Sequence, residues 1–170
     1  MMDNLNFYTV DMKYVNHLQQ VEMKARGFSR VPNVDYGKDR KQKFFTGIVL
    51  QINDTDYYVP VTSFKEKKPD NFVIIAKNGN AVSSLRFNYM FPVPAGLATV
   101  ISIDAQPDPK YKSLLSQELR YCIKNQDEIR RLAERTYKRV ILGKDKGLVH
   151  NSCSFVLLEQ ACRDYHAAER

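Results

Sequence analysis

Beyond its N-terminal segment, the chain changes its residue pattern at Asp108-Pro109, and this change constrains its fold more than any other feature. Before it, short runs of β-branched and aromatic residues alternate with turn-forming residues, which is typical of β-strands. After it, apolar residues recur at spacings of three and four, which is typical of amphipathic helices. Strands followed by helices predict an α+β fold. We expect a twisted, mostly antiparallel sheet or partial barrel, with flanking and C-terminal helices.

The N-terminal segment predicts a strand, a helix and then a long loop. Residues 7–10 favour a strand, and Asp11 is a suitable cap for a helix that places Tyr14 and Leu18 on one face. Residues 27–42 lose this periodicity and contain glycine, proline and many charges. A loop of that length inside a compact domain is usually functional or disordered.

A β-hairpin forms the centre of the predicted sheet. Residues 44–52 favour a strong strand, Asn53 to Asp56 favour a turn, and residues 57–61 favour the returning strand. Further strands are expected at residues 72–77, 82–87, 90–94 and 99–103.

The C-terminal part predicts three helices. Asp108 caps the first, because an aspartate accepts backbone N–H bonds and the proline after it suits the first helical turn. The second helix spans residues 125–142, with acidic residues near its start and basic residues toward its end. The third is expected to start at Asn151 or Ser152.

Length and composition narrow the class of protein. The chain has 170 residues, 44% hydrophobic and 26% charged, which fits one globular domain over residues 1–170. The sequence has no apolar run of about 20 residues that would cross a bilayer, and its N-terminus lacks the basic start and apolar block of a signal peptide. We therefore expect a cytoplasmic protein.

The sequence lacks the motifs of several enzyme classes. Three cysteines without paired spacing, three scattered histidines and dispersed carboxylates do not predict a metal site, so a metal-dependent nuclease is a poor fit. No Walker loop, Gly-x-Gly-x-x-Gly motif or Gly-x-Ser-x-Gly elbow occurs. We expect neither a metal ion nor an organic cofactor.

Basic residues are grouped, and the formal net charge is +7. The groups lie in residues 24–43, 65–68 and 130–146. Several basic segments on one small domain favour a polyanionic partner such as RNA. Charge alone is weak support, because many solvated surfaces are basic.

RNA can be cut without a metal ion, because its ribose 2′-OH can attack the neighbouring phosphate. The enzyme must align that hydroxyl, stabilise the charge on phosphorus and assist proton transfer. The best candidate constellation is Thr62-Ser63-x-Lys65, where a predicted strand ends among basic residues. Ser63 and Lys65 share a face in extended backbone. Lys43 lies just before residues 44–52, the strand that is expected to pair with residues 57–61.

Each of these residues also has an ordinary structural interpretation. Thr62 and Ser63 can simply end a strand while Lys65 is solvated. Lys43 can be a charge that protects a hydrophobic strand from aggregation, which is the commoner case.

Taken together, the segments resemble the toxins of type III toxin–antitoxin systems, the ToxN/AbiQ family. The resemblance covers nearly the whole chain and rests on the order and spacing of five landmarks. These are Phe7-Tyr8-Thr9 with Lys13-Tyr14, residues 43–50, residues 60–65, Lys110-Tyr111-Lys112 with Leu114-Leu115, and residues 153–159.

The resemblance implies a fold and an activity. Members of this family are metal-independent endoribonucleases with a twisted sheet similar to the core of the MazF/Kid toxins. A repeated, pseudoknotted RNA antitoxin blocks the toxin, which itself processes the repeat precursor, and RNA and protein can form closed oligomers. Phage infection upsets this balance, and the released toxin cuts target RNA (phage or host mRNA) in abortive infection.

The resemblance also implies residue roles. Ser63 and Thr62 would orient the scissile phosphate and the 2′-OH, while Lys43 and Lys65 would stabilise charge or transfer protons. The products would carry 2′,3′-cyclic phosphate and 5′-OH ends. The predicted RNA-binding residues are Tyr14, Tyr36, Tyr111, Lys112, Lys41 and Lys67.

Two alternatives remain open from the sequence alone. The same charge fits a non-catalytic RNA- or DNA-binding module, which would bind in a salt-sensitive way and never cut. A protein-binding effector held by a protein antitoxin would instead form a complex that survives RNase treatment.

Overall fold

The computed structural model describes residues 2–34 and 43–168, with side chains as far as Tyr165. The elements follow the chain as β1 (Asn6–Val10), α1 (Met12–Arg26), β2 (Phe45–Ile52), β3 (Thr55–Thr62), β4 (Asn71–Ile75), β5 (Ala81–Arg86), η1 (Phe87–Tyr89), β6 (Phe91–Pro92), β7 (Ala98–Val100), α2 (Pro109–Lys124), α3 (Gln126–Leu142), α4 (Lys146–His150) and α5 (Phe155–Ala168). After α1, the remaining strands all come before the remaining α-helices. The predicted α+β class is therefore confirmed.

The strands of the described residues form one seven-stranded sheet in the order β4-β5-β3-β2-β1-β7, with β6 paired to β3. Every pairing is antiparallel. Among these residues β4 and β7 do not pair with each other, so the sheet is open rather than a closed barrel. The β2–β3 hairpin lies at its centre, as its long apolar strands predict.

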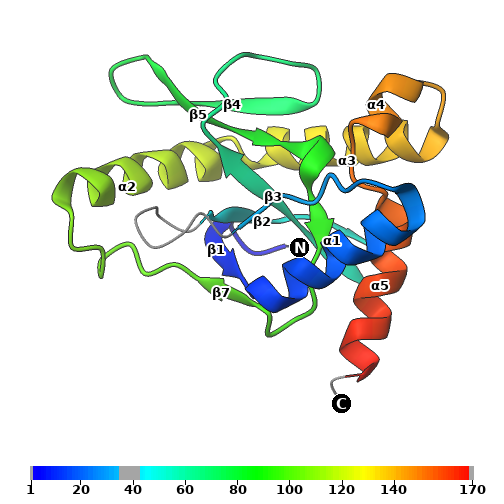
Figure 1. Ribbon diagram of the computed structural model, residues 1–170. Coiled ribbons are helices and arrows are strands. Elements are labelled where there is room, and N and C mark those ends of the chain that lie inside the picture. Colours follow the sequence, from blue (N-terminus) through cyan, green and yellow to red (C-terminus); the bar gives the residue numbers. More distant parts are fainter. Residues whose placement is uncertain (1, 35–42, 169–170) are drawn as a thin grey trace.

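The helices pack against the sheet in two groups (Figure 1). α2 contacts β1 and β4, and α3 contacts β2, β4 and η1. α1 packs along α5, which also contacts β3 and β6. The core between these layers is aromatic, with fully buried rings at Phe7, Phe45, Tyr57, Phe91 and Phe155.

Helix starts follow the caps that the sequence offers. The Asp11 side chain accepts from the Tyr14 N–H at 2.9 Å, and the Asp108 side chain accepts from the Lys110 N–H at 3.0 Å. Both caps satisfy backbone donors that have no partner inside the helix. None of the described helices is both long and apolar enough to span a membrane.

The last helix begins later than expected. We predicted a start at Asn151 or Ser152, but α5 begins at Phe155. The reason is an additional short helix, α4, whose first turn is capped by the Asp145 side chain at 3.0 Å from the Leu148 N–H. The prediction of a helix start at residue 151 or 152 was therefore wrong.

A close approach explains the glycine in the central strand. A β-carbon at Gly47 would collide with the ring of Tyr58, its partner on β3. Directly beyond this pair the register of β2 and β3 shifts, between Gly47 and Leu50. Any larger residue at position 47 must displace a ring that is itself almost fully buried.

Buried carboxylates connect the helices to the sheet. Glu159 on α5 accepts from the hydroxyls of Tyr57 (2.5 Å) and Tyr137 (2.8 Å), and so links α5 to β3 and α3. Glu118 on α2 accepts from the Ser83 hydroxyl of β5 at 2.5 Å. Burial raises the pKa of Glu118, although the Ser83 hydrogen bond opposes this.

We predict that Glu118→Gln raises the melting temperature at pH 7. A carboxyl whose pKa is higher in the folded than in the unfolded state costs stability at a pH above both values, and this cost disappears as pH falls below the unfolded value. The amide keeps an acceptor for Ser83 without a buried charge. Thermal unfolding at pH 7 and near pH 4 measures the effect.

The advantage of Glu118→Gln should shrink at the lower pH. Glu66→Gln is the control, because the Glu66 side chain is 75% exposed and its replacement should change little at either pH. An equal gain for both variants, or a lower melting temperature for Glu118→Gln at pH 7, would contradict the assignment.

Candidate active site

The register of the central hairpin places Lys43 beside Thr62. Phe45 of β2 lies opposite Pro60 of β3, and the Val61 N–H donates to the Phe44 carbonyl at 3.1 Å. One residue further along each chain, Lys43 therefore faces Thr62. Facing residues of antiparallel strands have Cα atoms about 4.5–5.5 Å apart.

Thr62 and Ser63 lie at the point where β3 ends. The Thr62 hydroxyl is 3.2 Å from the hydroxyl of buried Ser84 and 3.4 Å from the Ser84 carbonyl oxygen on β5. Ser63 follows in a bend, and its side chain is exposed. Thr62 is thus held by the sheet, while Ser63 is presented to solvent beside it. Lys43, Thr62 and Ser63 thus lie together where the β2–β3 pairing ends.

The loop that carries Lys65 and Lys67 is fixed at its base. Buried Asn71 accepts from the Lys68 N–H and donates to the Glu66 carbonyl, both at 2.8 Å. Lys65 and Lys67 are themselves exposed. Their side chains can move, but the loop that carries them stays next to Ser63.

A basic groove extends from this loop toward α3. The cavity has a volume of about 510 Å³. Its cationic lining residues are Lys67, Lys68, Arg131 and Arg135. Glu128 offsets part of this charge, since it forms a salt bridge with Arg131 at 2.6 Å. Phe72 and Tyr121 add aromatic faces, so the groove combines cations with stacking surfaces.

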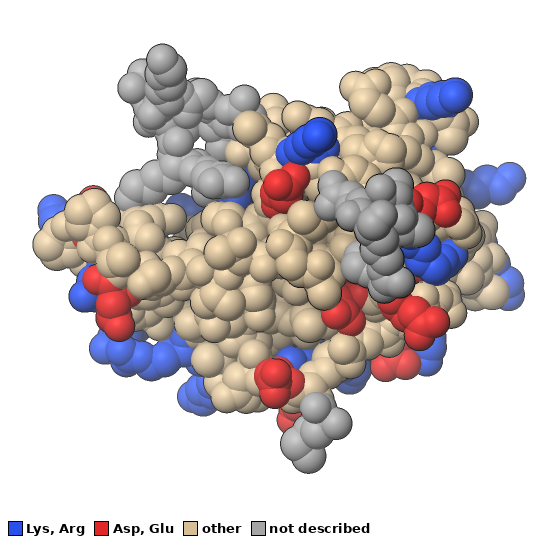
Figure 2. Space-filling view, turned by 90° about the horizontal axis from the view of Figure 1, so that it is seen from below, with Lys and Arg blue, Asp and Glu red and all other residues tan. Residues whose placement is uncertain are grey.

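Charges are distributed differently on the face shown in Figure 2. There, lysine and arginine side chains lie mostly around the rim, with acidic side chains between them, and the centre is largely uncharged. The groove is therefore a better candidate than this face for the predicted polyanion-binding surface.

Tyr111 and Lys112 lie in the first turns of α2. Lys112 is 3.8 Å from exposed Asp104, and Tyr111 is half-buried against the core. Burial and the nearby Glu118 carboxylate raise the pKa of Tyr111.

Tyr14 does not occupy the predicted position at an RNA surface. Its side chain is fully buried, packs edge-on against Tyr165, and its hydroxyl donates to the Pro92 carbonyl at 2.6 Å. Burial is the main reason that the pKa of Tyr14 is raised. A ring in the core cannot stack on a base in this arrangement, so the burial of Tyr14 argues against its predicted contact with RNA. Tyr36 and Lys41 lie outside the described residues.

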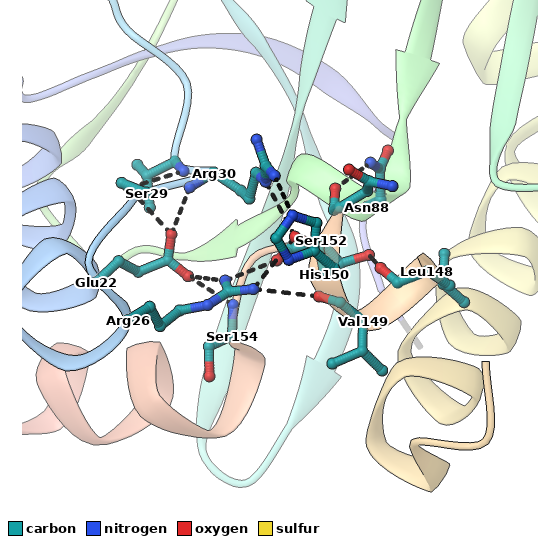
Figure 3. Close-up of polar contacts among 12 residues, drawn as sticks. Glu22, Arg26, Ser29, Arg30, Asn88, Leu148, Val149, His150, Ser152 and Ser154 are labelled. Atoms are coloured by element: carbon teal, nitrogen blue, oxygen red, sulfur yellow. Dashed lines mark hydrogen bonds and ion pairs between the residues drawn. The ribbon is translucent and has the colours of Figure 1, made fainter. Parts of the chain in front are cut away.

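A buried carboxylate holds the segment that leads into the basic loop (Figure 3). Glu22, at 0% exposure, accepts from the Arg26 side chain (2.9 Å), the Ser29 hydroxyl (3.0 Å) and the backbone N–H groups of Arg30 and Ser154 (both 2.7 Å).

Arg26 and Arg30 extend this network to the C-terminal part of the chain (Figure 3). Both donate to backbone carbonyls between Val149 and Ser152. Ser29 and Arg30 are thereby fastened to α1, and Arg30 also to the segment between α4 and α5. Neither the role of Glu22 nor that of its partners was visible from sequence, because the partners come from distant segments.

The described residues contain no group of three histidine, cysteine, aspartate or glutamate side chains that could hold a metal ion.

Two residues near the candidate site were not predicted from the sequence. They are Ser84, the partner of Thr62, and Arg86, two residues further along β5. The alternation of residues along the predicted strand could have indicated that these two side chains share a face.

Comparisons with known proteins agree with this architecture. Residues 6–163 match the family model described as "Toxin ToxN, type III toxin-antitoxin system". The endoribonuclease ToxN of Bacillus thuringiensis subsp. kurstaki is 29% identical over 174 residues, covering 96% of this chain and 85% of that protein. The endoribonuclease AbiQ of Lactococcus lactis subsp. lactis is 26% identical over 168 residues, covering 91% and 86%.

Two solved structures share the fold at somewhat higher coverage. One, from work on selective toxin inhibition by a non-coding RNA pseudoknot in bacterial type III toxin–antitoxin systems, has a TM-score of 0.84 at 26% identity and covers 96% of this chain and 99% of its own. The other, from work on a processed non-coding RNA that regulates a bacterial antiviral system, has a TM-score of 0.79 at 27% identity and covers 94% and 98%.

The network around Glu22 predicts a large loss of stability for Glu22→Ala. Removing one partner of a buried ion pair leaves the other charge and several donors unsatisfied, which costs about 3–5 kcal/mol. The free energy of unfolding, measured in urea, tests this. Glu134→Ala is the control, because its pair with Lys138 (2.9 Å) is exposed and such pairs contribute about 0–1 kcal/mol. A similar loss for both variants would rule out the special role of Glu22.

Proposed function

The chain belongs to the ToxN family of toxins from type III toxin–antitoxin systems, and on that basis we propose that it is an endoribonuclease that cuts RNA with Lys43, Thr62, Ser63 and Lys65. The observation that carries the residue assignment is the hairpin register, which places Lys43 next to Thr62 where β3 ends at Ser63. A cation and two hydroxyl groups at one edge are suited to binding a phosphodiester.

The reaction uses the nucleophile that RNA supplies. The ribose 2′-oxygen forms a bond to phosphorus as its proton leaves, and the bond from phosphorus to the 5′-oxygen of the next nucleotide breaks as that oxygen gains a proton. The products carry a 2′,3′-cyclic phosphate and a 5′-OH group. No metal ion takes part in this scheme, because lysine ammonium groups supply the positive charge.

Each residue has a separate task in this reaction. Thr62, held by Ser84, and Ser63, exposed at the strand end, orient the phosphate and the 2′-OH. Lys43 and Lys65 stabilise the charge that develops on the phosphate oxygens and exchange protons with the reacting oxygens. Lys67 and the groove beside it bind the RNA on one side of the cut.

The partner that inhibits the chain is, in this proposal, a repeated and pseudoknotted RNA that the enzyme itself processes. Support comes from the two similar structures, which concern toxin inhibition by an RNA pseudoknot and a processed RNA in an antiviral system. Release from this RNA during phage infection would let the enzyme cut cellular or phage mRNA. RNA that occupies both an edge and a groove of one chain can also bridge to the next chain.

The first test is cleavage of RNA by purified protein in EDTA. We expect cuts that leave 2′,3′-cyclic phosphate ends, and we expect Ser63→Ala to lose about 10²-fold or more in rate, because one group that acts on the transition state contributes that much. Ser102→Ala is the matched control, since Ser102 is also exposed but lies beyond β7. A requirement for Mg²⁺, full activity of Ser63→Ala, or tight binding without any cleavage would refute the proposal.

The second test concerns the basic groove. Lys67→Gln combined with Arg135→Gln should weaken binding of the antitoxin RNA, and the slope of log K against log salt should fall by about 0.7 for each lost contact to single-stranded phosphate. Lys144→Gln combined with Lys146→Gln removes the same charge from the exposed α3–α4 connection and the first residue of α4, and should leave the slope almost unchanged. Equal effects of the two pairs would mean that only net charge matters, and the groove would not be a binding site.

A further inference from the structure

The guanidinium group of Arg86 contacts two aromatic rings next to the loop that follows Ser63. Its central carbon is 4.4 Å from the ring centroid of Phe64 and 4.9 Å from that of Tyr89. Phe64 directly follows Ser63, and Tyr89 ends the short helix η1. Contact with two rings restricts the orientation of the guanidinium group, whose N–H donors lie in its plane and point away along its edge.

No carboxylate of the described residues pairs with this cation. Within residues 2–34 and 43–165, Arg86 takes part in no salt bridge, and its buried Nε is left without a hydrogen-bond partner. Arg86 as a whole is only partly buried, but a buried charged donor is normally paired, because leaving it unsatisfied is costly. The unsatisfied Nε of Arg86 therefore indicates an acceptor that comes from outside the described residues.

The strand register places Arg86 close to the proposed site. Thr62 of β3 pairs with Ser84 of β5, and the two hydroxyl groups are 3.2 Å apart. Arg86 lies two residues beyond Ser84, so it is on the same face of β5. The stacking with Phe64 brings the guanidinium group from β5 to the backbone that adjoins Ser63.

We propose that Arg86 binds a phosphate group of the RNA next to the linkage that is cut at Ser63, which rests on the proposed function. An RNA phosphate is an acceptor-only oxyanion, and a planar guanidinium group can donate two parallel hydrogen bonds to it. Because Phe64 and Tyr89 already hold the side chain, little rotamer freedom is lost on binding. Arg86 thus sets the register of the RNA relative to Ser63 and is not itself a proton-transfer group.

A purely structural role makes a different prediction. If Arg86 only supports the loop between Ser63 and Asn71, its removal would lower stability and the catalytic rate together. If Arg86 contacts a phosphate, its removal lowers affinity and reduces the number of counterions that RNA binding releases.

The experiment measures RNA binding and cleavage for wild type, Arg86→Gln, Arg86→Lys and the control Arg163→Gln. Arg163 lies on α5 and donates to the Asn53 carbonyl, at the opposite end of the β2–β3 hairpin. The probe for binding is a single-stranded RNA that contains the cut site with a 2′-deoxy nucleotide at the cut, so that it cannot react. Affinity is measured at several salt concentrations, and cleavage is measured on the unmodified RNA.

For Arg86→Gln we expect a loss in affinity of about tenfold or more and a salt slope that is smaller by about 0.7. The value of kcat at saturating RNA should change far less than in Ser63→Ala. Arg86→Lys should restore the salt slope but only part of the affinity, because lysine lacks the planar fork. Arg163→Gln should resemble wild type in all three measurements.

Two results would overturn the inference. One is wild-type affinity and slope for Arg86→Gln. The other is a lowered melting temperature and kcat with an unchanged slope, which would make Arg86 only a support of the loop. If wild type cuts no RNA, the proposed function fails. The phosphate contact is then tested separately by binding to unmodified RNA. A smaller salt slope for Arg86→Gln would support the contact, and an unchanged salt slope would overturn it as well.

Discussion

The register of β2 against β3 is the constraint on which the candidate site depends. The hydrogen bond from the Val61 N–H to the Phe44 carbonyl continues the pairing past the end of β2, and it decides that Lys43 faces Thr62. A slip of one residue would turn Lys43 to the other face of the sheet. The contact of Tyr58 with Gly47 and the register shift beyond it restrict the pairing to one alignment. Packing in the middle of the hairpin thus fixes the chemistry at its end.

Buried carboxylates extend this rigidity from the sheet to the helices. Glu159 joins α5 to β3 and α3, Glu118 joins α2 to β5, and Glu22 joins α1 to the segment entering the basic loop. Each accepts hydrogen bonds from distant parts of the chain, so each specifies one arrangement of the elements around the hairpin. The exposed lysines at Lys65 and Lys67 are therefore the mobile groups of a site whose supports are fixed.

Local patterns in the sequence predicted the elements better than they predicted the site. The central hairpin and the caps at Asp11 and Asp108 were expected correctly, because each depends on neighbouring residues. The burial of Tyr14 could not be predicted, because its family position did not reveal that its hydroxyl reaches the Pro92 carbonyl, 78 residues away. Arg86 was missed for the same reason, since its aromatic partners lie on a loop and a short helix whose meeting is a tertiary feature.

A double-mutant cycle on Lys43 and Ser63 tests the central claim most directly. Lys43→Met, Ser63→Ala and the double variant would be compared with wild type by kcat/KM for RNA cleavage in EDTA. If the hairpin register makes the two residues one site, the double variant should be at most a few-fold slower than the slower single variant, since groups that act as a unit are strongly non-additive. If the fold-losses in kcat/KM of the two single variants multiply in the double variant, Lys43 and Ser63 act independently. That result would contradict a single site at this strand end.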